Sequence, residues 1–300
     1  MVRNEFPVLL HGGNTMRSLL IYGTGGYIES IVLPRIRAKV PDLRIAVMSN
    51  RPAHSANFAA KQGVECLQSL ADIPSFDAFF LASSPLDYPD FMRELPDTAR
   101  VWVEKPLCEL AEDELKAIVQ AGERFVVPPN TGMNKRHLPE LVELAGISEI
   151  SGTIDMRLEY APAMEHGAWR QYLLRGGVYW ADGVHAFDLG LFLLGDEAGI
   201  SFTRMDAGMW EAEVVSPKGR IRVRVGREVE ERTELNGTRW PALWSPDAGH
   251  RSFDANLAGF LAGDSNWQAV VACHEKMLKA CLARIAANGP AGGYAEPGNW

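Results

Sequence analysis

The stretch Val101-Trp102-Val103-Glu104-Lys105-Pro106-Leu107 decides how this chain is expected to fold. Its apolar first half is typical of a buried strand, and Pro106 ends that strand because proline has no backbone N–H to donate. Lys105 is therefore expected at the carboxyl edge of the strand. Because ligands bind beyond this edge in open parallel α/β sheets, the stretch predicts a functional lysine as well as a sheet.

The segments around this stretch alternate between short apolar runs and helical patterns. We expect strands at residues 17–22, 43–48, 76–82 and 101–103, and the apolar run 125–127 closes the first domain. This alternation favours a doubly wound parallel sheet. The pair Pro128-Pro129 predicts a boundary. It gives a dinucleotide-binding domain at 1–128, in which 1–16 is a loose extension, and a second domain at 129–300.

The first expected strand runs directly into Gly23-Thr24-Gly25-Gly26-Tyr27-Ile28. Glycine allows a tight turn and lets the backbone approach a pyrophosphate, whose charge is favoured by the start of the next helix. The sixth position of the dinucleotide-binding pattern is normally Gly or Ala. Here it is Ile28, which predicts looser packing of the helix on the strand. Further along the same helix, Pro34 predicts a kink or an early break.

Other turns after expected strands are also candidates to contact the cofactor. Ser49-Asn50-Arg51 stands where an NAD site usually places Asp or Glu against the ribose hydroxyls. Arg51 is instead placed to meet a 2′-phosphate, so this turn favours NADP over NAD; a solvated loop arginine is the alternative. The remaining candidates are Ser83, Ser84 and Pro85 after the third strand, and Glu104 and Lys105 after the fourth.

The second half of the chain combines a polar helix with antiparallel strands. Asp182, His185 and Asp188 recur every three residues, so they can share one face of an expected helix. Residues 209–215 and 220–225 are expected to form a hairpin. In the second of these strands arginines alternate with apolar residues, which gives a basic face that is either solvated or part of a subunit contact.

Composition excludes several classes of function. The formal net charge is −8 at pH 7, which argues against binding to nucleic acid or to an anionic membrane. None of the four cysteines forms a CxxC pair, and we expect no metal site. No apolar run approaches the ~20 residues of a membrane span. A cytoplasmic protein that acts on a small molecule is the resulting expectation.

The chain resembles the Gfo/Idh/MocA family of NAD(P)-dependent oxidoreductases over about residues 17–288. The resemblance rests on Gly23-Thr24-Gly25, Glu104-Lys105-Pro106 and the stretch from Gly176-Gly177 to Gly183-Val184-His185-Ala186-Phe187-Asp188. It implies a Rossmann domain followed by an α/β domain with an open, mostly antiparallel sheet. Members commonly act on sugar or cyclitol alcohols and the matching ketones. The resemblance also implies a homo-oligomer, a dimer or tetramer, assembled through the C-terminal sheet.

Proton transfer must accompany hydride transfer, and the resemblance assigns it to lysine, histidine and aspartate. Lys105 can polarise the substrate oxygen, and His185 can exchange a proton near neutral pH. The family places its aspartate four residues before the histidine, where this chain has Ala181. Asp182, three residues before, is the catalytic candidate instead. The substrate-site candidates besides Lys105 and His185 are Tyr160, Trp169, Arg170 and Trp180.

Several alternatives stay open from the residues. An enzyme of the same fold could reduce an imine, or use NAD as a recycled redox assistant in glycoside cleavage, and the shifted aspartate keeps both open. A cofactor-sensing protein without catalysis is the third, because fold alone does not dictate function. Plain structural roles are a salt bridge to Glu104 for Lys105 and a core position for His185.

Overall fold

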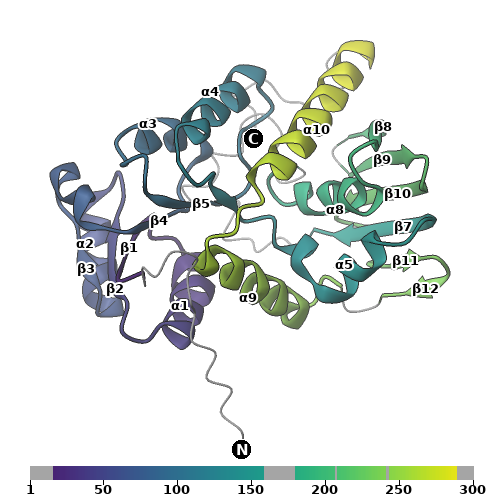
Figure 1. The fold of residues 1–300 in the computed structure, drawn as a ribbon. Helices are drawn as coiled ribbons and strands as arrows, with labels where there is room; N and C mark the ends of the chain where they lie inside the picture. Colours follow the sequence, from purple (N-terminus) through teal and green to yellow (C-terminus); the bar gives the residue numbers. More distant parts are fainter. Residues whose placement is uncertain (1–15, 159–179, 207, 241–242, 289–300) are drawn as a thin grey trace, which may run out of the picture. The chain divides into compact units, whose positions relative to one another are not determined.

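The computed structural model describes residues 16–158, 180–206, 208–240 and 243–288 of the 300-residue chain. The chain divides into two compact units (Figure 1). Unit 1 comprises Met1–Glu104, Ile118–Gly132 and Asp254–Gln268, and unit 2 comprises Lys105–Ala117, Met133–Phe253 and Ala269–Trp300. The division differs from a single boundary after residue 128, because the chain enters and leaves unit 1 several times.

Sheet A is the core of unit 1 and has six strands, all parallel. They are β1 (Ser18–Tyr22), β2 (Arg44–Met48), β3 (Glu65–Cys66), β4 (Ala78–Leu81), β5 (Arg100–Val103) and β6 (Asn130–Thr131). Their order, β3-β2-β1-β4-β5-β6, is that of the Rossmann fold. Every residue of β4 is fully buried, which agrees with its apolar sequence and with a sheet covered on both faces. The predicted doubly wound parallel sheet is confirmed.

The helices of unit 1 begin with an unusual turn. A π-helical turn, η1 (Ile28–Val32), leads into α1 (Leu33–Lys39). Pro34 lies at the start of α1, so the break predicted there takes the form of this wide turn, which accommodates a residue that cannot donate a helical hydrogen bond. The other helices of unit 1 that follow strands are α2 (Pro52–Gln62), η2 (Leu70–Ser75), η3 (Pro85–Asp87) and α3 (Tyr88–Arg93). The helix α4 (Glu112–Glu123) begins in unit 2 and ends in unit 1.

The last strand of sheet A corrects the sequence prediction. Residues 125–127 are not a strand, and the sheet closes with β6 after the two prolines. Both residues of β6 are polar and buried. The side chain of Asn130 donates to Asn256 Oδ1 at 2.8 Å, and the Thr131 amide donates to Asn266 Oδ1 at 2.7 Å. An apolar pattern could not reveal a strand that is stabilised by asparagine side chains.

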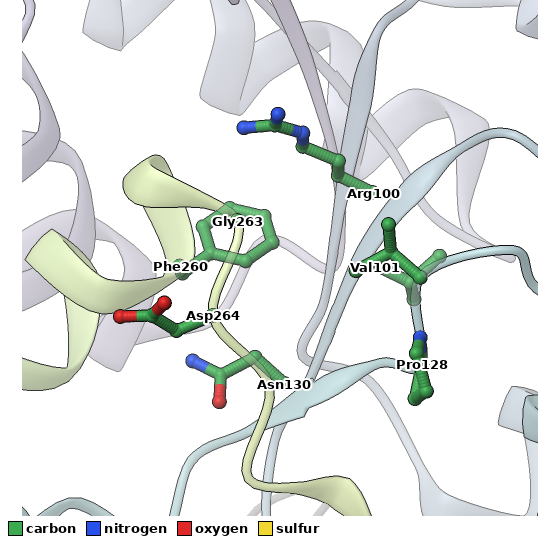
Figure 2. A pocket seen from close by; sticks show the side chains of 8 residues that line it. Arg100, Val101, Pro128, Asn130, Phe260, Gly263 and Asp264 are labelled. Atoms are coloured by element: carbon green, nitrogen blue, oxygen red, sulfur yellow. The ribbon is translucent and has the colours of Figure 1, made fainter. Parts of the chain in front are cut away.

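A small pocket lies at the amino-terminal edge of β5 and β6, on the side of sheet A away from Glu104 and Lys105. Figure 2 shows Arg100, Pro128, Phe260 and Asp264 around it. The Arg100 guanidinium donates to the Leu261 carbonyl at 3.1 Å. This arginine joins the sheet to the end of α9 (Pro246–Ala262). Ligands of such sheets bind at the carboxyl edge, so we assign this pocket to the packing of the helix on the sheet and not to ligand binding.

Sheet B is the core of unit 2 and is mostly antiparallel. Its strands are β7 (Ile150–Arg157), β8 (Gly199–Met205), β9 (Met209–Ser216), β10 (Gly219–Gly226), β11 (Thr233–Leu235) and β12 (Thr238–Arg239). They follow the order β12-β11-β7-β10-β9-β8, in which β7 and β10 alone run parallel. The predicted open sheet and its β9–β10 hairpin are confirmed.

Helices cover one face of sheet B. The helix α8 (Val184–Leu194) packs on β7, β9 and β10, and it also contacts η4 (Asn134–His137) and α5 (Pro139–Ala145). The chain continues through α10 (Trp267–Asn288). No helix in the described ranges is long and apolar enough to cross a membrane.

Candidate active site

The glycine turn after β1 is built around two glycines with different requirements. Gly23 has a φ of +135°, and a Cβ there would lie 2.3 Å from the Ala82 carbonyl oxygen, so a larger residue would force the backbone to shift. A Cβ on Gly25 or Gly26 would meet nothing within 4 Å. The turn therefore packs tightly against the end of β4 on one side and leaves space on the other, where a dinucleotide pyrophosphate would approach the backbone.

Glu104 anchors the end of β5. It is buried, and it accepts a hydrogen bond from Trp102 Nε1 at 2.9 Å and a longer one from the Tyr27 hydroxyl at 3.5 Å. A Cβ on Gly132 would lie 2.3 Å from Glu104 Oε2. The glycine after β6 therefore provides the space that the Glu104 carboxylate occupies. Within unit 1, Glu104 connects β5 to the exposed Tyr27 of the glycine turn.

The turn after β2 carries two basic side chains. Arg51 precedes α2 and is exposed, and its amide donates to Ser49 Oγ at 3.2 Å. Ser49 Oγ also lies 2.6 Å from Ser55 Oγ, which fixes the turn. Nδ1 of His54 lies 2.8 Å from the Thr24 hydroxyl, so the structure brings the β2 turn and the glycine turn together. Sequence reasoning missed His54, because a single histidine in a helix carries no motif.

The turn after β4 is held by its own side chains. The Ser84 hydroxyl accepts from the Leu86 amide at 3.3 Å and caps η3, which starts at Pro85. The Ser83 hydroxyl donates to Asp87 at 3.2 Å, while the Ser83 carbonyl accepts from Tyr88 at 3.1 Å. Ser83 and Pro85 are half-buried at the carboxyl edge of sheet A, and their contact with a cofactor stays a prediction.

Lys105 is the first residue of unit 2 along the chain. Its Nζ donates to Asp182 Oδ1 at 2.6 Å and to the Ala181 carbonyl at 3.1 Å. Asp182 lies in a two-residue turn between the helical residues Trp180 and Ala181 and the start of α8. The aspartate that is displaced by one position in the sequence therefore still reaches the lysine.

His185 lies in the first turn of α8 and is half-buried. Its pKa lies well below the usual value, first because of burial and then because of the positive charges of Lys105 and Lys135 and the nearby His274. No described residue hydrogen-bonds to its ring. At neutral pH its imidazole is neutral, and it keeps a lone pair that can accept a proton.

Two buried residues hold the backbone that follows Lys105. The Trp180 indole N–H donates to the Cys108 carbonyl at 2.6 Å, and the Leu107 amide donates to His274 Nε2 at 3.4 Å. His274 Nδ1 pairs with the Val270 carbonyl at 3.1 Å, so Nδ1 carries the proton. Trp180 is 2% exposed and supports this loop, and the substrate contact predicted for it stays a prediction. His274 was missed because a helical pattern does not mark it.

A buried ion pair underlies the polar face of α8. Arg136 donates to both carboxylate oxygens of Asp188, and both side chains are 5% exposed or less. This contact agrees with a structural role for Asp188. Arg136 also lies beside Cys273 Sγ at 3.5 Å.

The described residues do not include three of the predicted substrate residues. Tyr160, Trp169 and Arg170, the other predicted substrate residues, lie outside the described residues. Among the residues that the structure describes, no group of three or more His, Cys, Asp or Glu side chains could hold a metal ion.

No protein-family model and no curated protein sequence matches the chain. Its fold, however, matches solved oxidoreductases. A Gfo/Idh/MocA family oxidoreductase from Vibrio cholerae has a TM-score of 0.63 at 16% identity, over 90% of this chain and 98% of that one. The dehydrogenase MviM from Clostridium difficile gives 0.67 at 14%, over 89% and 99%.

A third solved structure is a myo-inositol dehydrogenase from Lactobacillus casei in complex with NAD(H) and myo-inositol. Its TM-score is 0.63 at 15% identity, over 89% of this chain and 95% of that one. The chain therefore has the fold of the Gfo/Idh/MocA oxidoreductases over most of its length.

Proposed function

We propose that this protein is an NAD(P)-dependent oxidoreductase of the Gfo/Idh/MocA family that interconverts an alcohol and a ketone on a small, polar, sugar-like or cyclitol-like molecule. The observation that carries the proposal is the Lys105 ammonium, which Asp182 holds at 2.6 Å in a site that also contains neutral His185. The open glycine turn at the carboxyl edge of sheet A supports the cofactor half of the proposal. The myo-inositol dehydrogenase of the same fold, solved with NAD(H), agrees with both halves.

The cofactor half rests on backbone and turn residues of unit 1. The residues that would hold a nicotinamide dinucleotide are Gly23, Thr24, Gly25, Gly26, Tyr27, Ser49, Asn50, Arg51, Ser83, Ser84, Pro85 and Glu104, followed by Lys105. When bound, this cofactor supplies or accepts a hydride. Gly25 leaves the open space that a pyrophosphate needs, so the residues fit the group.

Three side chains of unit 2 carry out the proton transfer in this proposal. The Lys105 ammonium donates a hydrogen bond to the substrate oxygen and stabilises the negative charge that develops there. Asp182 and the Ala181 carbonyl orient that ammonium. In alcohol oxidation, neutral His185 accepts the hydroxyl proton; in ketone reduction, the oxygen takes a proton from the same lysine–histidine pair.

NADP is the preferred cofactor in this proposal. Arg51 and His54 supply positive or donor groups at the turn where an NAD site would place a carboxylate. A 2′-phosphate would pair with the Arg51 guanidinium. We expect Arg51→Ala to weaken NADPH binding about tenfold, the scale of one charge-assisted hydrogen bond, and to change NADH binding less. Calorimetric titration of both cofactors measures this, and equal losses would contradict the preference.

Turnover tests the whole proposal. The full chain is supplied with reduced or oxidised cofactor and with panels of polyols, keto-sugars and imines, and the absorbance of the reduced nicotinamide is followed. Oxidation of a polyol or reduction of a keto-sugar is the expected result. Turnover of imines alone would favour an imine reductase, and a cofactor that never exchanges would favour the glycosidase. Cofactor binding without turnover of any class would favour a sensing protein and contradict the proposal.

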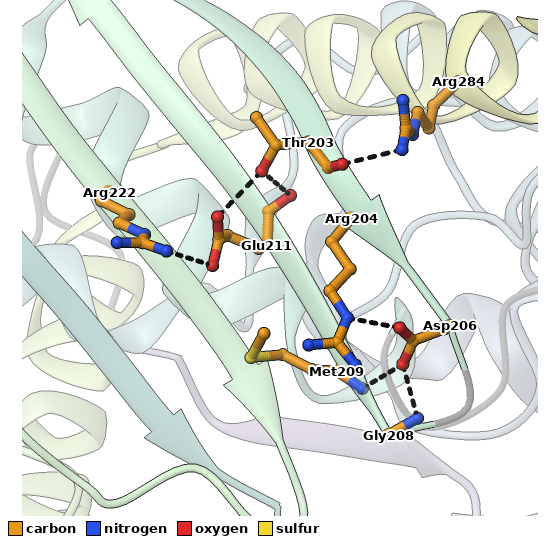
Figure 3. A network of polar contacts seen from close by, with 8 residues as sticks. All are labelled: Thr203, Arg204, Asp206, Gly208, Met209, Glu211, Arg222 and Arg284. Carbon is orange, nitrogen blue, oxygen red and sulfur yellow. Dashed lines mark hydrogen bonds and ion pairs between the residues drawn. The ribbon is translucent and has the colours of Figure 1, made fainter.

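We also propose a homo-oligomer formed through the uncovered face of sheet B. Arg222 pairs with Glu211 at 2.7 Å, and Glu211 accepts from the Thr203 hydroxyl at 3.0 Å (Figure 3). The basic face predicted for β10 is thus neutralised by β9, which lowers the repulsion between two copies. Sedimentation of the full chain tests this: a dimer or tetramer is expected, and a monomer would contradict it.

A further inference from the structure

Lys105 is held by a segment that is itself tied back to the loop of the lysine. The Lys105 ammonium donates to the Ala181 carbonyl at 3.1 Å and to Asp182 Oδ1 at 2.6 Å. From the residue just before these acceptors, the Trp180 indole N–H donates in the opposite direction, to the Cys108 carbonyl at 2.6 Å. The two segments form a clasp, in which a side chain of each binds a backbone carbonyl of the other.

The two ends of this clasp differ in their exposure to water. At the outer end, the side chains of Lys105 and Asp182 are 22% and 37% exposed, and an ion pair at such exposure stabilises little. At the inner end, Trp180 and Cys108 are buried. A hydrogen bond between buried groups is electrostatically stronger, and its loss leaves a buried acceptor without a partner. The inner end is therefore the part of the clasp that fixes its geometry.

His274 of α10 packs against the inner end of the clasp. Its Nε2 accepts from the Leu107 amide at 3.4 Å, and its ring meets the Trp180 ring edge to face, with 6.1 Å between the ring centres. Its other nitrogen, Nδ1, pairs with the Val270 carbonyl of the same helix at 3.1 Å. The backbone that follows Lys105 is thus anchored to α10, and all of these residues belong to unit 2.

The placement of the Lys105 ammonium depends on this clasp. A lysine side chain is a flexible four-carbon stem that carries a compact charge, and a misplacement of about 1 Å in an active site can lower the rate about a hundredfold. The acceptors of Lys105 directly follow Trp180 in the chain, so their positions depend on the indole that the Cys108 carbonyl holds. Loss of the indole N–H would release both segments and leave Lys105, Asp182 and His185 all present.

We propose that Trp180 is a positioning residue, whose hydrogen bond to the Cys108 carbonyl, supported by His274, places the Lys105 ammonium for proton chemistry. The effect on turnover rests on the proposed function, whereas the placement of the ammonium does not. A positioning role and a substrate contact of Trp180 have different kinetic signatures. Loss of a contact that binds substrate and transition state equally raises KM alone, whereas loss of positioning lowers kcat.

Steady-state kinetics of Trp180→Phe separate the two roles, because this variant keeps an aromatic ring and removes the N–H. Its kcat should fall about tenfold to a hundredfold, the scale of a misplacement of about 1 Å, while KM changes much less. Trp210→Phe is the matched control, because Trp210 of β9 is also 2% exposed, and it should keep the wild-type kcat. A raised KM at unchanged kcat, or equal losses of kcat in both variants, would overturn the proposal.

Labelling of Lys105 tests its placement without turnover. The folded full chain is treated with a trace of acetic anhydride, and the acetylation rate of each lysine is measured by mass spectrometry. A lysine nitrogen that donates to two fixed acceptors reacts more slowly than one in water, so Lys105 should react several-fold faster in Trp180→Phe. Lys218 is the internal reference, because it donates to the Ala145 carbonyl at 2.7 Å and should keep its rate. Unchanged labelling of Lys105 would overturn the proposal.

Two variants of His274 keep the proposal testable if Trp180→Phe fails to fold. His274→Gln offers an oxygen acceptor to the Leu107 amide, whereas His274→Leu, of similar size, offers none. Lys105 should be labelled faster in His274→Leu than in His274→Gln, and equal rates would overturn the proposal.

The labelling and the kinetics also distinguish the failure of this proposal from the failure of the proposed function. If labelling of Lys105 changes as expected but the wild-type protein turns over no substrate, the proposed function fails and the positioning role stands. If the wild-type protein turns over its substrate but Trp180→Phe matches it in kcat and in labelling, the positioning role fails and the proposed function stands.

Discussion

The glycine-rich edge of sheet A and the polar cluster beside α8 are two candidate functional regions built in different ways. At the edge of sheet A, the decisive features are backbone geometry and empty space, at Gly23 and Gly25. In the cluster, they are buried charged side chains such as Lys135, Arg136 and Asp188. Substitutions in the cluster should therefore alter chemistry and stability strongly, whereas substitutions at the edge should separate folding from cofactor binding.

The largest effect is expected at Lys105. Lys105→Met removes the ammonium that Asp182 and Ala181 hold, and turnover should fall about a thousandfold, within the range of acid–base and electrostatic contributions. Steady-state rates and thermal melting measure the two consequences separately. The melting temperature should stay close to that of the wild type, because the side chain is partly exposed. Near-wild-type turnover would remove Lys105 from the proposed chemistry.

The next effect distinguishes a buried ion pair from a partly exposed one. Arg136→Met leaves the Asp188 carboxylate buried and unpaired, which should reduce the free energy of unfolding by about 3–5 kcal/mol. Arg222→Met breaks a pair on sheet B in which the arginine is 49% exposed and the glutamate 14%, and it should cost less, about 1 kcal/mol. Denaturant unfolding of both variants measures the difference, and similar losses would contradict the contrast.

His274 links the stability of the cluster to pH. Burial lowers its pKa to about 4, from about 6.5 in the unfolded chain. Between these values the unfolded chain binds more protons, so its contribution to stability is present above pH 6.5 and is lost as pH falls toward 4. The loss should be about 3 kcal/mol, at about 1.4 kcal/mol per pKa unit.

The matched variant for this pH effect is His274→Gln, which offers an oxygen acceptor to the Leu107 amide in place of Nε2. Unfolding measured from pH 7 to pH 4 should show a shallower decline for this variant than for the wild type. Parallel declines would show that His274 does not titrate as its burial requires.

The last pair of variants separates the two glycines of the edge. Gly23→Ala places a Cβ 2.3 Å from the Ala82 oxygen at a φ of +135° and should cost about 1–3 kcal/mol. Gly25→Ala meets no atom within 4 Å, so its melting temperature should match the wild type while NADPH affinity falls. Thermal melting and calorimetry measure the pair. A Gly25→Ala protein that binds NADPH normally would show that the pyrophosphate lies elsewhere.

Sequence patterns predicted the fold better than the site. The strands of sheet A could be located because buried parallel strands are continuous apolar runs, and the β9–β10 hairpin because its residues alternate. The polar strand β6 could not be located in this way. The hydrogen-bonding groups of its residues pair with Asn256 and Asn266, which lie more than 100 residues away in the sequence.

Within the site, Lys105 and His185 could be found from motifs and their chemistry. The contact between Lys105 and Asp182 depends on the turn before α8, whose geometry a residue spacing does not contain. His274 could not be assigned, because its role follows from burial and from a partner distant in the sequence. Side chains that support or complement a site carry no local pattern.

Isotope transfer from the cofactor shows directly whether this protein moves a hydride to a carbonyl carbon. Reduced cofactor that carries deuterium at the transferable position of its nicotinamide ring is mixed with the full chain and a carbonyl substrate, and the product is analysed by mass spectrometry. We expect one deuterium on the former carbonyl carbon with the wild-type protein, and almost none with Lys105→Met, which should still bind the cofactor. A wild-type protein that binds the cofactor but transfers no deuterium to any keto-sugar would contradict the proposed function.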